Sequence, residues 1–252
     1  MALSGQDRGT GNHNSSVTTL GIRSTTNFSG TSGAMAVFCM SLDNARSGGA
    51  AYDAATFLVS DSAGNTWTGR LFPINDPGAA NAGVAGAIFT APIVSAITTA
   101  TTITIGLGTA STAKAWTLSE AVPDSGWRVV YVTGANGTAA TTTTPSITTT
   151  SIASGNLVLG GLFNEHGTAQ TATGDADATN GSWSTQQTNE IGTTAAGQTI
   201  TTQYKIVTTG ATQTYNPTLG VSSDLVLSWI ELTELRNVRD IIGAGPIPWH
   251  RP

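Results

Sequence analysis

Two short segments of the chain are apolar at nearly every position, although the sequence as a whole is rich in small polar residues. They are Met35–Leu42 and Leu157–Phe163, and both lie between glycines. Runs of this length are too short for a typical helix and favour strands that are covered on both faces. Alternating segments such as Ala115–Val122 and Leu225–Leu232 predict further strands, whose exposure changes along their length. Because no long segment shows helical periodicity, the pattern predicts an all-β chain.

Landmarks of the first half of the chain recur in the same order in the second half. The segment SGAMAVFCMSLDN from Ser32 resembles SGNLVLGGLFNEH from Ser154. Each half also contains two tryptophans at similar separations, namely Trp67, Trp116, Trp183 and Trp229. We therefore predict two weakly similar halves, approximately 16–123 and 145–235, each of four or five strands.

Each predicted half has an apolar face to bury, and packing the two faces together gives an antiparallel β-sandwich over 16–235. We expect the four tryptophans to anchor the shared core, because truncating a buried tryptophan to alanine costs about 3–5 kcal/mol. The remaining residues are expected to form extended arms, 1–15 at the N-terminus and 236–252 at the C-terminus. Three prolines stiffen the C-terminal arm, in which Ile247 and Trp249 are apolar side chains for docking on a neighbouring subunit.

Three short motifs mark strands or turns: SDSAGNTW at Ser60, AWTLSEAVP ending at Pro123, and GNLVL at Gly155. Together they resemble motifs of the jelly-roll-like β-sandwich virion proteins of tailed bacteriophages, which include minor tail and capsid decoration proteins. The resemblance implies a jelly-roll-like fold and a multimeric structural protein of the virion, assembled in the host cytoplasm. Its partners would be further copies of the chain and other virion proteins. The resemblance brings no catalytic residues and no cofactor with it.

Charge and composition narrow the expected partners. Charged residues make up 10% of the chain, against roughly 25% in an average soluble protein, and the formal net charge is −5. Nucleic-acid binding is not expected, because it needs clustered positive charge. Membrane insertion is not expected either, since the chain has no run of about 18 apolar residues and no signal-peptide pattern. The single cysteine, Cys39, is expected to be a small core residue.

The segment SDSAGNTWT (Ser60–Thr68) suggests either a calcium loop or a β-turn. Asp61, Ser62 and Asn65 offer oxygen ligands, but a calcium site typically needs six or more. An aspartate at the first position and Gly64 at a position that needs a positive φ are typical of a turn. We therefore predict a turn between two strands.

The segment Gly174–Ser182 is the better candidate for a metal site. Asp175 and Asp177, with Asn180 and backbone carbonyls, can supply the oxygen ligands that calcium prefers. Loops of this composition are more often solvated turns, and that remains the preferred interpretation.

Catalysis is not expected from the residues in the sequence. The histidines are His13, His166 and His250, and no nucleophile-elbow motif GxSxG is present. Glu165 and His166 are adjacent, so on a strand their side chains point to opposite faces. A pair of carboxylates for glycoside cleavage can nevertheless lie far apart in sequence, which leaves a glycan-degrading enzyme as the third hypothesis.

The main alternative to a virion protein is a carbohydrate-binding module or adhesin for host-surface glycans. Two loops, 42–53 and 74–83, are rich in Asp, Asn and Gly, and Tyr52 lies in the first of them. Such loops at one end of a sandwich bind sugars in some proteins and only connect strands in others. Loss of glycan binding in Tyr52→Ala or Trp127→Ala variants would favour this alternative.

Overall fold

The first half of the chain forms one antiparallel sheet in the computed structural model, which describes residues 3–30, 32–43, 55–76, 83–166, 170–192 and 197–236. The strands of this sheet are β1 (Ser4–Ile22), β2 (Met35–Asp43), β3 (Leu58–Asp61), β4 (Thr68–Leu71), β5 (Ile74–Asn75), β6 (Val84–Pro92) and β7 (Ile103–Val122). Their order is β1-β7-β2-β6-β4, with β3 paired to β7 and β5 paired to β6.

The second half of the chain forms the other large sheet and two small ones. The strands of the large sheet are β8 (Trp127–Asn136), β9 (Ala140–Thr142), β11 (Leu157–His166), β13 (Gln187–Ile191), β14 (Gly197–Ile206) and β17 (Ser223–Arg236). Their order is β13-β14-β11-β17-β8, and β9 pairs with β17. The small sheets pair β10 (Ile147–Ile152) with β15 (Ala211–Tyr215), and β12 (Ala172–Thr173) with β16 (Thr218–Leu219).

The predicted all-β class and antiparallel sandwich are confirmed, since every strand pairing within the described ranges is antiparallel. The two large sheets also share an order of strands: β2 lies between β6 and β7, and β11 lies between β14 and β17. The relationship of the halves as a repeat, and the jelly-roll-like topology, stay predictions. No helix in the described part of the chain has the length and apolar character needed to cross a membrane.

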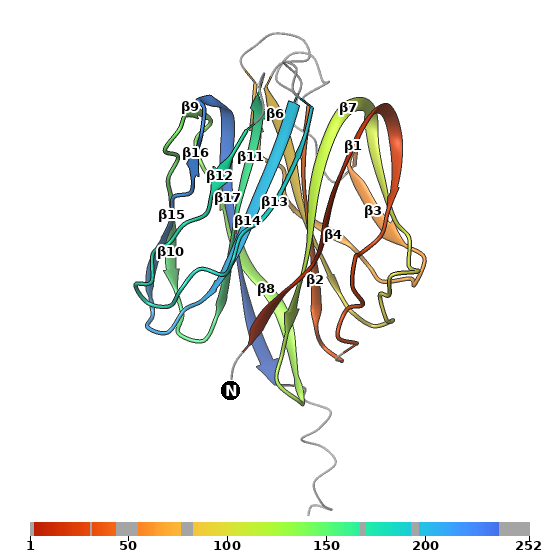
Figure 1. The fold of residues 1–252 in the computed structure, drawn as a ribbon. Coiled ribbons are helices and arrows are strands. Elements are labelled where there is room, and N and C mark those ends of the chain that lie inside the picture. Colours follow the sequence, from red (N-terminus) through yellow and green to blue (C-terminus); the bar gives the residue numbers. More distant parts are fainter. Residues whose placement is uncertain are drawn as a thin grey trace, which may run out of the picture.

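Both large sheets are covered on both faces, so the molecule has layers outside the central pair (Figure 1). Every residue of β2 and β11 is buried, as the continuous apolar runs predicted. Between the sheets lies a core of mostly aliphatic residues, with Val37, Ile88, Leu159 and Ile230 among them. A second apolar cluster covers the outer face of the first sheet, and a third lies under the small sheets beside the second.

The expected position of the four tryptophans in the shared core is wrong. Trp116 and the partly buried Trp67 pack in the outer cluster of the first sheet, while Trp183 and Trp229 pack in the outer cluster of the second. The reason lies in the alternation of side chains along the strands. On β7 the small residues Ala115 and Ala121 face the other sheet, which leaves Trp116 on the outer face.

The expected N-terminal arm, 1–15, is also corrected by the structure, because Ser4–Ile22 is the edge strand β1 and pairs with β7 over most of its length. Its glycines and polar residues do not resemble a strand in sequence. Gly11 lies directly against the indole of Trp116, where a Cβ atom would collide with the ring. The missing side chain therefore allows the strand backbone to cover the tryptophan. The C-terminal arm, with Ile247 and Trp249, lies outside the described residues.

A buried ion pair fixes β1 to β7. The Arg8 guanidinium donates from Nε to Glu120 Oε2 at 2.7 Å, and the Glu120 side chain is fully buried. The Ser29 backbone amide donates to the same oxygen at 2.9 Å, and the Ser29 hydroxyl donates to Oε1 at 2.5 Å. The carboxylate thus has partners on both oxygens, which is the condition under which a buried charge is tolerated.

Replacing Arg8 with methionine is expected to destabilise the fold by about 3–5 kcal/mol, because Glu120 would remain as a buried charge without its cation. Urea unfolding at neutral pH measures this loss. The double variant Arg8→Met/Glu120→Gln is expected to recover much of it, because the buried charge is then removed as well. A cost below about 1 kcal/mol for Arg8→Met would contradict a buried pair, since that is the range of exposed pairs.

Candidate functional site

The SDSAGNTWT segment forms the predicted turn, organised by the carboxylate of Asp61. Its Oδ1 accepts hydrogen bonds from the backbone amides of Ala63 at 2.9 Å and Asn65 at 3.2 Å. Its Oδ2 accepts a bond from Trp67 Nε1 at 2.7 Å, and Gly64 has a φ of 86°. The carboxylate oxygens are therefore used inside the turn, as the turn interpretation requires.

The same turn holds a surface segment in place. The side-chain oxygen of Asn65 accepts hydrogen bonds from the backbone amides of Val94 and Ser95, both at 2.9 Å, and Asn65 Nδ2 donates to the Ser95 carbonyl at 3.1 Å. Val94 and Ser95 line a groove on the surface. The motif that sequence analysis singled out therefore acts as a support for this groove.

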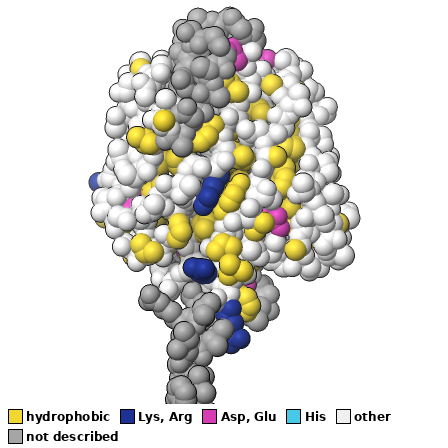
Figure 2. Space-filling model, turned by 180° about the vertical axis from the view of Figure 1, so that it is seen from behind, with side chains coloured by type: hydrophobic (Ala, Val, Ile, Leu, Met, Phe, Trp, Pro, Cys, Tyr) yellow, Lys and Arg dark blue, Asp and Glu magenta, His cyan; other side chains and the backbone are white. Residues whose placement is uncertain are grey.

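The groove has a volume of about 620 Å³ and lies where β4 and β8 form the edges of the two large sheets. It is lined by Gly30, Ser32, Gly33, Met35, Arg70, Pro92, Ile93, Val94, Ser95, Ala96, Arg128, Val129, Val130 and Tyr131. On the face seen in Figure 2, basic side chains lie among hydrophobic ones. The volume is within the range of about 300–1,000 Å³ that is usual for ligand pockets.

Arg70 is the central polar group of the groove. Its guanidinium lies over the ring of Tyr131, 4.3 Å from the ring centre, and Nε donates to Thr90 Oγ1 at 2.8 Å. Burial lowers the pKa of Arg70, and the adjacent Tyr131 acts in the opposite direction. Burial likewise raises the pKa of Tyr131. The guanidinium is thus oriented by its surroundings and partly removed from water.

The metal candidates Asp175 and Asp177 lie together but are occupied by protein groups. Asp175 is buried and accepts the amide of Asp177 on Oδ1 at 2.7 Å and that of Asn216 on Oδ2 at 2.9 Å. Asp177 pairs with Lys205 at 3.1 Å. The pKa of Asp177 is lowered, mainly by hydrogen bonds from Thr179. Among the described residues no group of three or more His, Cys, Asp or Glu has the arrangement of a metal site.

A polar pocket of about 430 Å³ lies beside these aspartates. It is lined by Asp177, Thr179, Asn180, Thr212, Gln213, Thr214 and Asn216. Hydroxyl and amide groups dominate this lining, in contrast to the apolar and basic lining of the groove. The chemistry suits a ligand with many hydroxyl groups, such as a sugar.

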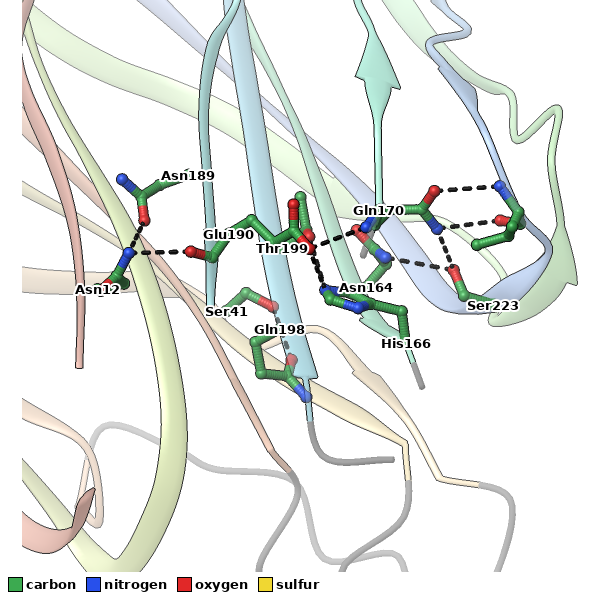
Figure 3. Close-up of polar contacts among 11 residues, drawn as sticks. Asn12, Ser41, Asn164, His166, Gln170, Asn189, Glu190, Gln198, Thr199 and Ser223 are labelled. Atoms are coloured by element: carbon green, nitrogen blue, oxygen red, sulfur yellow. Dashed lines mark hydrogen bonds and ion pairs between the residues drawn. The ribbon is translucent and has the colours of Figure 1, made fainter. Parts of the chain in front are cut away.

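A network of buried polar side chains lies at the end of the sandwich where β11 and β13 finish (Figure 3). His166 Nε2 is 2.9 Å from Thr199 Oγ1 and 3.9 Å from Glu190 Oε1. In a catalytic triad the acid binds the ring nitrogen opposite the nucleophile, so this geometry is not that of a triad. Thr199 is also completely buried. The cluster therefore connects strands and does not present a nucleophile to a substrate.

Glu165, next to His166 on β11, has different partners, as expected for adjacent residues on a strand. Its Oε2 accepts the backbone amide of Gly83, while Oε1 is buried without a hydrogen-bond partner in the described part of the chain. The pKa of Glu165 is raised to about 8, mainly by burial; the hydrogen bond from Gly83 acts in the opposite direction, and the nearby Asp43 and Asp224 contribute to the rise. Burial likewise raises the pKa of Asp43 to about 6.

A scan of family models and searches of curated proteins and of solved structures found no match to this chain. The functional interpretation therefore depends on the chemistry of the groove and the polar pocket. The groove was not predicted from the sequence. Arg70, Arg128 and Tyr131 are separated in sequence, and neither their spacing nor a local motif indicates that they meet. Tyr52, named for sugar binding, lies outside the described residues.

Replacing Glu165 with glutamine is expected to remove part of the pH dependence of stability. Between pH 4.5 and about 8 the folded chain retains the Glu165 proton while the unfolded chain loses it. The folded state then binds more protons, so the free energy of unfolding falls as pH rises through this window, with a slope of at most about 1.4 kcal/mol per pH unit.

Urea unfolding of the wild type and of Glu165→Gln between pH 4.5 and 8 tests this expectation. The variant is expected to gain stability over the wild type as pH rises. Asp43→Asn serves as a comparison, because the pKa of Asp43 itself is only about 6. The slope above pH 6 should remain in that variant but end at a lower pH, since Asp43 no longer raises the pKa of Glu165. Parallel curves for the wild type and Glu165→Gln would show that Glu165 ionises normally.

Proposed function

We propose that the chain is a structural virion protein of a tailed bacteriophage, which assembles as a multimer on the tail, as a minor tail protein, or on the capsid surface, as a decoration protein. The observation that carries this proposal is a set of exposed apolar side chains on and beside β8 in the described part of the chain. Val94 is 79% exposed, and Val132 and Leu235 are each 46% exposed. Exposed apolar side chains next to a free strand edge favour a surface that another protein covers.

The sequence supports the same proposal independently. The motifs SDSAGNTW, AWTLSEAVP and GNLVL resemble those of jelly-roll-like virion proteins. A charged share of only 10% leaves few side chains to prevent strand edges from pairing with other chains. Such a surface suits a subunit that is surrounded by neighbours. The proposed partners are further copies of the chain and other virion proteins, with assembly in the host cytoplasm.

Deleting Gly243–Pro252 is expected to lower the molar mass of the purified chain in multi-angle light scattering, from a defined oligomer to a smaller species. The thermal unfolding temperature should stay unchanged, because the last described strand, β17, ends at Arg236. The variant Ile247→Ser/Trp249→Ser keeps the length and the prolines, and should lose mass in the same way. An equal mass for all three proteins would rule out docking through this segment.

Carbohydrate binding, as a module or adhesin for host-surface glycans, is the second candidate function. The polar pocket beside Asp177 and Asn216 favours it, since its lining offers hydroxyl and amide groups for sugar hydroxyls. The two functions are compatible, because a protein on the surface of a virion can also contact the surface of the host.

If the polar pocket binds glycans, replacing Asn216 with alanine should abolish specific signals on a glycan array. The backbone amide of Asn216, which donates to Asp175, is retained in this variant, so the fold should be preserved. Trp127→Ala is the matched comparison, because Trp127 does not line this pocket. Signals that survive Asn216→Ala and disappear in Trp127→Ala would place the sugar site elsewhere.

A further inference from the structure

The groove between β4 and β8 is lined by two arginines and by no acidic residue. Arg70 and Arg128 are among its lining residues, and no Asp or Glu is. This is notable in a chain that has 10 basic and 15 acidic residues. Within the described ranges neither arginine forms an ion pair, since the ion pairs found there involve Arg8, His166 and Lys205.

The position of Arg70 makes its lack of a negatively charged partner significant. Thr90 and the ring of Tyr131 hold the guanidinium, while its terminal nitrogens have no hydrogen bond to any described residue. Removing a charge from water without a counter-charge is unfavourable. An anion bound in the groove would supply that counter-charge, and a carboxylate matches the planar fork of donors on a guanidinium.

The rest of the lining favours a polypeptide as the source of this carboxylate. Apolar side chains, including Met35, Pro92, Ile93 and Val94, form much of the wall. The groove lacks the side-chain amides that line the polar pocket. One ring face of Tyr131 is already covered by Arg70, so that face is not available to stack on a sugar. An extended peptide with alternating acidic and apolar side chains fits both parts of this lining.

The edge of the second sheet offers backbone groups to such a peptide. β8 pairs with β17 on one side and has no strand on its other side in the described part of the chain. The backbone amide of Val129 on this side already donates to the Gly33 carbonyl at 2.7 Å, so only the part of the edge beyond Val129 is open to a peptide. A free edge can add a further strand, with affinity from the main chain and specificity from side-chain contacts.

We propose that the groove binds an extended acidic segment of a neighbouring protein, with one carboxylate against Arg70, a second acidic side chain near Arg128, and the segment's backbone along the part of β8 beyond Val129. Pairing of β8 with β8 of a second copy is disfavoured, because it would bring arginines of like charge together. This inference rests on the proposed virion function, in which neighbouring subunits supply such segments.

A random decapeptide library displayed on yeast and selected with the full chain tests this proposal without a known partner. Deep sequencing is expected to show Asp and Glu enriched at one or two positions over the input library. The most enriched peptide is then synthesised, and fluorescence anisotropy measures its affinity. Replacing Arg70 or Arg128 with glutamine should weaken binding about tenfold each, as expected for a lost charge-assisted bond.

Arg23→Gln is the control, because Arg23 is exposed and does not line the groove; its affinity should equal that of the wild type. The side chain of Arg128 has no hydrogen bond or ion pair to another described residue, so Arg128→Gln keeps the test valid if Arg70→Gln unfolds. Absence of acidic enrichment, or unchanged affinity in both groove variants, would overturn the proposal. So would a glycan array on which uronate-containing glycans bind through Arg70 and Arg128 while peptides do not.

The selection and the light-scattering experiment can fail separately. If the chain stays monomeric but selects acidic peptides, the groove stands as a binding site and self-assembly through the C-terminal segment is ruled out. If the chain oligomerises without selecting acidic peptides, the assembly stands and the groove is ruled out as a peptide-binding site.

Discussion

The central strands of both large sheets are buried on both faces, and much of the molecule is arranged to provide that cover. The central strands β2 and β11 have no exposed residue, so each sheet needs apolar material on its outer face as well as on its inner face. β7 contributes to this by exchanging β3 for β2 on one side along its length, while β1 pairs with it throughout on the other side. Near this change the buried ammonium of Lys114 donates to the carbonyls of Ser15, Ser111 and Thr112, which satisfies its three donors.

The interface between the sheets is aliphatic in one region and hydrogen-bonded in another. In the polar region Ser41 donates to Gln198 at 3.0 Å and Ser119 donates to Gln187 at 2.9 Å, so each bond joins one sheet to the other. Buried hydrogen bonds of this kind need a defined alignment, because a shift of the sheets would leave polar atoms without partners. The polar region therefore sets the alignment, while the aliphatic region supplies most of the hydrophobic stabilisation.

The two sides of the sandwich differ as a result. On one side Asn12 of β1 donates to Asn189 and to the Glu190 carbonyl, and closes the gap to β13 (Figure 3). On the other side β4 and β8 leave the groove with its two arginines. The Asp61 turn supports one wall of this groove through Asn65. The side that is open is therefore also shaped by fixed hydrogen bonds, as a preformed binding surface requires.

The sequence by itself determined the all-β class, the buried strands β2 and β11, and the Asp61 turn. The sequence signals of these features are local, because apolar and polar residues alternate, or fail to alternate, within a few positions. Only the tertiary structure decided that Ser4–Ile22 is a strand, because Gly5 and Gly11 serve contacts with Tyr204 and Trp116, which are distant in sequence. It also placed the tryptophans outside the shared core and brought Arg70 to Tyr131. These outcomes depend on which strands become neighbours, and that choice is made by packing between segments distant in sequence.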